Sequence, residues 1–166
     1  MKRRATILTA VALLTLTGCG GSDKPDGKPA TPGQAAARDA ADIFTALAAQ
    51  VKTAKLSGVV TADNDPNHLL GRPSQYTSKI TFTDTRIEKT DVEGLDAGGV
   101  GRGGAIEQFA KSDEAHARAQ YIQAIVKVFP LVAEYDYIHG TSLIRVSHLL
   151  TPTQAGDYHK AADQLP

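Results

Sequence analysis

Two long stretches of the chain carry apolar residues every three or four positions, the spacing that places them on one face of a helix. The first opens with Thr31-Pro32-Gly33-Gln34, a capping box with proline at the first helical position. Its apolar positions are Ala36, Ala40, Ile43, Phe44, Leu47 and Val51. Glycine often terminates helices, so Gly58 is the expected end of this helix.

The second helix is predicted to begin at Ser112 and to stop before Pro130. Asp113 and Glu114 fall in its first turn, where the helix dipole favours negative charge. Its apolar face consists of Ala115, Ala119, Ile122, Ile125, Val126 and Phe129. A third helix is predicted at Thr151-Pro152-Thr153-Gln154, which repeats the capping pattern of the first.

Between these helices, the apolar positions alternate as they do in strands. Residues 79–86 place Ile80 and Phe82 on one face, and residues 59–62 and 105–109 are shorter candidates. Residues 134–147 predict a hairpin with His139-Gly140 as its two-residue turn.

The predicted hairpin turn fixes a pairing register. That register places Tyr135 opposite Ile144 on an inward face, together with Tyr137. It also pairs Glu134 with Arg145 on the exposed face, where such an ion pair contributes at most about 1 kcal/mol.

The order of elements favours an α+β fold, with a mainly antiparallel sheet of about four to five strands and helices packed on one face. We expect a single domain over residues 33–166, because a chain of this length suffices for one core.

The N-terminal residues have the pattern of an export signal. Lys2, Arg3 and Arg4 precede an uncharged stretch that is too short to span a bilayer as a helix. Leu16-Thr17-Gly18-Cys19 resembles the lipobox of bacterial lipoproteins, and Cys19 is the only cysteine. The alternatives are an ordinary secretory signal with an incidental cysteine and, from Arg3-Arg4, twin-arginine export.

The lipobox resemblance implies cleavage after residue 18 and a diacylglyceryl group on Cys19, which would hold the protein on the outer face of the cell membrane. Two acyl chains anchor a protein stably. Residues 19–32 are rich in glycine and proline and are predicted to form a flexible tether.

Composition weighs against nucleic acid as a partner. Without residues 1–18 the chain has 15 basic and 18 acidic residues, a net charge of about −3. Nucleic-acid-binding domains are usually basic.

Residues 63–76, DNDPNHLLGRPSQY, leave three interpretations open. Asp63, Asp65 and Asn67 occupy the first, third and fifth positions of a calcium loop. That loop would need a glycine where His68 stands and a glutamate where Ser74 stands, so no metal site is expected.

The favoured interpretation of this stretch is structural. Asp65 would cap a short turn that Gly71 ends, with Leu69 and Leu70 in the core. In the third interpretation, the stretch is a recognition loop in which Arg72 and Tyr76 contact a polar or anionic partner.

The sequence contains no convincing catalytic motif, which gives little support to an enzymatic function. Residues 99–104 match GxGxxG formally, but the helix that a dinucleotide site needs does not follow. There is no GxSxG elbow and no cysteine for a nucleophile besides Cys19. We therefore expect no cofactor and favour a non-enzymatic protein. The alternatives are a small envelope hydrolase or wall-modifying enzyme with a tertiary site, and an inhibitor or regulator of a secreted enzyme.

Residues 64–79, 105–125 and 134–155 resemble a group of small actinobacterial envelope lipoproteins. The resemblance implies an envelope location and a single compact domain, and it carries over no catalytic residue. Together these observations predict a membrane-anchored binding module whose partner is an envelope protein, a wall component or a small ligand.

Overall fold

The computed structural model describes residues 38–165, which contain three α-helices and a five-stranded antiparallel sheet. The predicted α+β class is therefore confirmed. The strands are β1 (Ala54–Val59), β2 (Ser78–Asp84), β3 (Gly103–Gln108), β4 (Glu134–His139) and β5 (Ser142–Ser147), in the spatial order β1-β2-β3-β5-β4. The helices are α1 (Ala40–Gln50), α2 (Ser112–Val128) and α3 (Pro152–Asp163). Short 3₁₀ turns η1 (Lys89–Val92), η2 (Val100–Arg102) and η3 (Pro130–Val132) complete the described part.

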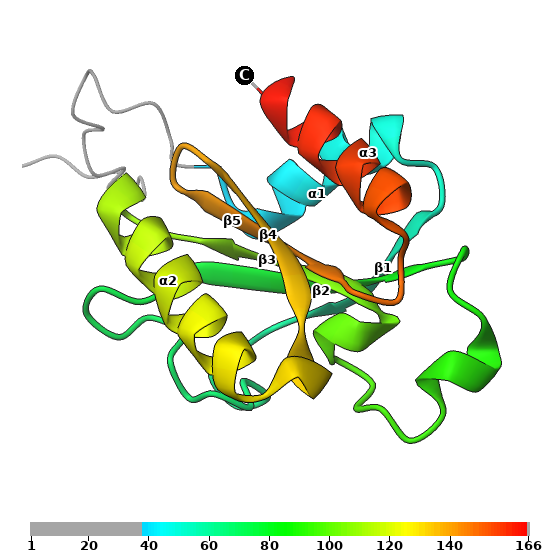
Figure 1. Ribbon diagram of the computed structural model, residues 1–166. Coiled ribbons are helices and arrows are strands. Elements are labelled where there is room, and N and C mark those ends of the chain that lie inside the picture. Colours follow the sequence, from blue (N-terminus) through cyan, green and yellow to red (C-terminus); the bar gives the residue numbers. More distant parts are fainter. Residues whose placement is uncertain (1–37, 166) are drawn as a thin grey trace, which may run out of the picture. The chain divides into compact units, whose positions relative to one another are not determined.

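The helices cover both faces of the sheet, so the expectation of helices on one face was wrong (Figure 1). On one face, α1 and α3 pack against Ile80, Phe82 and Ile144. On the other face, Ala115, Ala119 and Ile122 of α2 form a second core with Leu143. All six residues of β3 are buried because this central strand is covered on both sides.

Helix α1 ends at Gln50 and not at Gly58. Its N-cap is Asp39, whose carboxylate accepts hydrogen bonds from the backbone amides of Ala41 and Asp42. The predicted start at residues 31–34 lies outside the described residues. Residues 54–59 form β1 and pair with β2, so the strand predicted at 59–62 was placed too late.

The predictions for α2, α3 and β2 are confirmed. Helix α2 begins at Ser112 and ends before Pro130, and α3 uses Thr151 and Gln154 as a reciprocal capping box. Ile80 and Phe82 both belong to the main core.

Two glycines of the stretch 99–104, Gly103 and Gly104, allow β3 to approach its neighbouring strands closely. A Cβ on Gly104 would overlap the carbonyl oxygen of Arg145 and the ring of Phe82. A Cβ on Gly103 would lie 2.6 Å from the backbone of β2. These two glycines therefore serve the packing of β3 between its neighbours.

Candidate functional site

The predicted loop 63–76 is organised around the buried carboxylate of Asp65. This carboxylate accepts hydrogen bonds from the amides of Leu69 at 2.8 Å and Leu70 at 2.9 Å, and from the Tyr76 hydroxyl at 2.7 Å. Burial alone would raise the pKa of Asp65, but the hydrogen bonds outweigh it and hold the pKa at about 2. Asp65 therefore acts as the cap of a turn.

The residues of this loop that were predicted to form a binding site lie partly in the interior and partly at the surface. Tyr76 is fully buried and donates its hydroxyl hydrogen to Asp65, so its oxygen does not face a partner. Asp63, Asn67 and Arg72 are exposed. Only Asn67 of these three lines the adjacent groove.

A groove of about 620 Å³ lies between this loop and α2. Asn67, Ser74 and Gln75 line it from the loop. Tyr121, Ile122, Ile125 and Val126 line it from α2, with Val132 at one end. Its volume falls in the range of ligand sites in proteins.

Three charged side chains, Arg118, Glu134 and Arg145, line this groove. Lys79 and Glu107 are joined to them by ion pairs, and we call these five residues the floor cluster. Glu107 of β3 is fully buried and lies at the centre. It contacts Lys79 at 3.1 Å, Arg118 at 3.0 Å and Arg145 at 2.9 Å. Burial by itself would raise the pKa of Glu107, but the three cations, led by Arg145, hold the pKa at about 2. Glu107 is therefore an ionised carboxylate at neutral pH.

The hairpin β4–β5 adds a second carboxylate to the floor cluster. Glu134 binds Arg145 in a two-point contact, with Nε–Oε1 at 2.7 Å and Nη2–Oε2 at 2.8 Å. The two side chains are largely buried, so the expectation that Glu134 and Arg145 form an exposed ion pair was wrong. The turn is Gly140-Thr141, which moves the register by two residues and leaves Glu134 opposite Ser147. An even shift keeps each side chain on its predicted face.

Asp136 of β4 lies opposite Arg145 at the edge of the floor cluster. Burial raises the pKa of Asp136 to about 7, with a further rise from the charge of Glu134. Its Oδ2 accepts a hydrogen bond from Gln123 at 2.6 Å, whereas its buried Oδ1 has no partner among the described residues. Asp136 is thus a carboxyl group that titrates near neutral pH.

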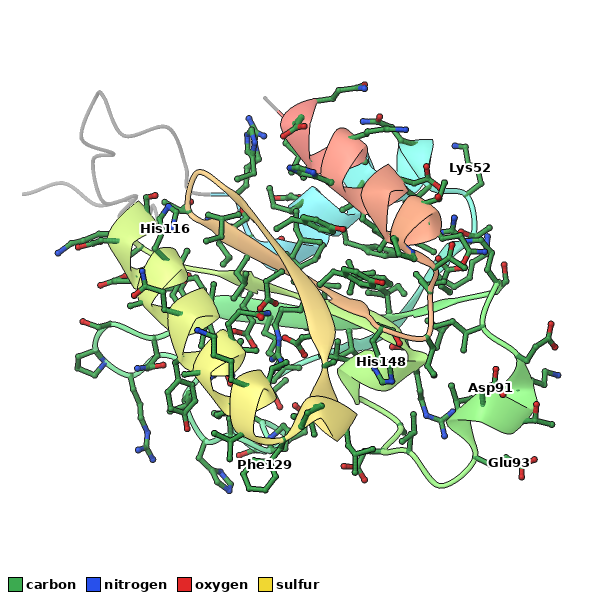
Figure 2. The ribbon with its side chains drawn as sticks, viewed as in Figure 1. Lys52, Asp91, Glu93, His116, Phe129 and His148 are labelled. Atoms are coloured by element: carbon green, nitrogen blue, oxygen red, sulfur yellow. The ribbon has the colours of Figure 1, made fainter. Side chains whose placement is uncertain are left out.

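An exposed apolar surface adjoins the groove where α2 ends. Val128, Phe129, Leu131 and Val132, which we call the apolar tip, are each more than half exposed, and Leu131 is 92% exposed. Figure 2 shows Phe129 at this end of α2, directed away from the sheet. Sequence analysis predicted that Phe129 lies on the buried face, but the helix extends past the edge of the core at that point.

Part of this groove could be predicted from the sequence. The sequence indicated the loop 63–76 and the apolar face of α2. It did not indicate Glu107 or Arg118, and it placed Arg145 in an exposed ion pair. The available signal was Glu107 within an otherwise uncharged strand candidate, since a charge in a buried strand needs partners. The partners come from β2, α2 and β5, which the sequence does not bring together.

The chain matches no family model, no curated protein and no solved structure in the comparisons. Over the described residues, no helix combines the length and apolar character needed to cross a membrane. Within residues 38–165, no three His, Cys, Asp or Glu side chains are grouped so that they could hold a metal ion.

Proposed function

We propose that this protein is a lipid-anchored, non-enzymatic binding module on the outer face of the cell membrane. Cys19 carries the anchor, and residues 19–32 tether the domain. The lipobox-like stretch, the resemblance to small actinobacterial envelope lipoproteins and the lack of local catalytic motifs support this proposal.

The partner is another envelope protein, and it docks on the apolar tip. The observation that carries this conclusion is the exposure of four neighbouring apolar side chains, with Leu131 92% exposed. Exposed contiguous apolar surface of this kind marks interaction sites. Leu131 is suited to act as an anchor because a partner could remove nearly all of its side-chain surface from water.

Cross-linking of the native lipoprotein in its own envelope, followed by mass spectrometry, tests the proposal. We expect one reproducible protein partner, cross-linked near residues 128–132. Leu131→Asp should reduce its capture at least about tenfold, because a buried unpaired charge opposes docking.

Leu56→Asp is the matched control. Leu56 is a half-exposed leucine on β1, at the opposite edge of the sheet from β4. Its replacement should leave capture unchanged. Capture that survives Leu131→Asp, or that both changes reduce equally, would contradict docking on the apolar tip.

A further inference from the structure

Arg118 is a largely buried guanidinium with unused hydrogen-bond donors. Its side chain is 10% exposed and lines the groove. Its Nε donates to Glu107 Oε2 at 3.0 Å, and this is its only hydrogen bond to residues 38–165. The guanidinium carbon lies 5.7 Å from the centroid of the Tyr121 ring. The two terminal amino groups of Arg118 therefore lack a protein acceptor in the described part of the chain.

The two terminal amino groups of Arg118 are open to an acceptor from outside. They are not among the buried side-chain atoms that lack a partner, so water reaches them in the groove. A guanidinium has five N–H donors in a planar fork, and a carboxylate that replaces this water can match two of them at once with charge-assisted hydrogen bonds.

The floor cluster has one more cation than it has carboxylates. The floor cluster holds three cations, Lys79, Arg118 and Arg145, and two carboxylates. Glu114 also lines the groove, but its carboxylate accepts the backbone N–H of Lys111 and forms no ion pair with Arg118. Asp136 resists ionisation, since burial raises its pKa to about 7.

The two walls of the groove favour a peptide over an acyl chain. The wall formed by α2 is apolar at Ile122, Ile125 and Val126. The opposite wall carries the amide and hydroxyl groups of Asn67, Ser74 and Gln75. A peptide backbone satisfies such groups, whereas an acyl chain would remove them from water without a partner.

We propose that the groove binds a peptide segment whose carboxylate sits on Arg118 and whose neighbouring aliphatic side chain packs on Ile125 and Val126. This inference rests on the proposed function, because the segment belongs to the protein partner that docks on the apolar tip. Val132 lies both in the tip and in the groove, so one partner can cover both surfaces.

Short synthetic peptides test the groove directly. The probes are acetyl-Gly-Val-Leu with a free terminal carboxylate, the same peptide as its carboxamide, and acetyl-Gly-Val-Leu-Asp carboxamide. The protein is the chain from residue 19 with Cys19→Ser, labelled with ¹⁵N and followed by NMR. We expect the free carboxylate to shift the Arg118 Nε resonance, and the carboxamide to bind at least about tenfold more weakly. The aspartate probe distinguishes a side-chain carboxylate from a chain terminus.

Ala117→Trp blocks the groove without altering the floor cluster, because Ala117 is an exposed residue of α2 that lines the groove. Ala124→Trp is the matched control, since Ala124 is exposed on the same helix and does not line the groove. We expect peptide binding to be lost in the first and kept in the second. Arg118→Gln should likewise abolish the preference for the carboxylate, and Arg72→Gln should retain it.

Equal binding of carboxylate and carboxamide, or full binding by Ala117→Trp, would overturn the inference. The envelope cross-linking separates this failure from failure of the proposed function. If Leu131→Asp abolishes capture while neither carboxylate probe binds, the apolar tip docks the partner and the groove inference is wrong. If the free carboxylate binds while Leu131→Asp leaves capture intact, the groove inference stands and the docking on the tip is wrong.

Discussion

At the scale of single residues, Asp65 and Asp63 show how neighbouring carboxylates of one type take different roles. Asp65 is buried and accepts hydrogen bonds from three backbone amides and from Tyr76. Asp63, two positions earlier, is exposed. The spacing that resembles a calcium loop therefore arises in part from a turn that needs one capping carboxylate.

This difference predicts unequal effects on stability. Asp65→Ala leaves several buried donors without an acceptor and should lower the free energy of unfolding by about 3 kcal/mol. Asp63→Ala should change it by no more than about 0.5 kcal/mol. Urea unfolding of both variants measures the two values. Equal small effects would mean that Asp65 does not hold the loop.

The capping role of Asp65 could be predicted from the sequence, whereas the place of Arg118 in the floor cluster could not. A cap is recognisable because its partners lie within a few positions along the chain, as Leu69 and Leu70 do. The acceptor of Arg118 is Glu107, which lies on a different element, and only the fold brings the two together.

At the scale of elements, the hairpin β4–β5 explains why the floor cluster is buried. The turn at Gly140-Thr141 places Asp136 opposite Arg145, and Gly140 adopts a φ of 56°, which glycine tolerates best. The register then brings Glu134, Asp136 and Arg145 under α2. A shift by one residue would have turned the tyrosines toward α2 and the charged side chains toward the main core.

The buried Asp136 predicts a pH dependence of stability. Its pKa is about 7 in the folded protein and near 3.8 in the unfolded chain, so the folded state binds the extra proton between these values. Stability contributed by this group is therefore present below about pH 4 and is lost as pH rises to about 7. Asp136→Asn should remove this loss, so that the variant gains stability relative to the original protein between pH 5 and pH 8.

Urea unfolding at several pH values measures this difference. Glu107 and Asp65 titrate at about 2 when folded, so they affect stability only at lower pH. Asp63→Asn is the control, since Asp63 is exposed and should keep the original pH dependence. A parallel pH dependence in Asp136→Asn and in the original protein would refute the assignment of the titration to Asp136.

At the scale of the whole molecule, the described domain has a core on each face of its sheet and an apolar tip beyond one of them. Two covered faces let charged side chains be buried between the sheet and α2, where one covered face would have left them in water. The groove exists because α2 and the loop 63–76 share that face without filling it.

The proposed anchor predicts where the whole protein is found in the cell. Cys19→Ser removes the only cysteine, so the protein should leave the membrane fraction for the medium or retain its first 18 residues. Fractionation and intact-mass measurement test this outcome. An unchanged mass and unchanged membrane retention would refute a lipid on Cys19.

Elements with local signals could be predicted from the amino-acid sequence alone. The caps and apolar spacing of α2 and α3, the alternation of β2 and the inward face of the tyrosines all depend on residues close together in the chain. The end of α1, the register of the hairpin and the placement of α2 on the second face became known from the folded structure. These features depend on pairing and burial between distant segments, whose free energies are absent from any single stretch of sequence. The floor cluster is the clearest case, because its charges become partners only where five separate elements meet.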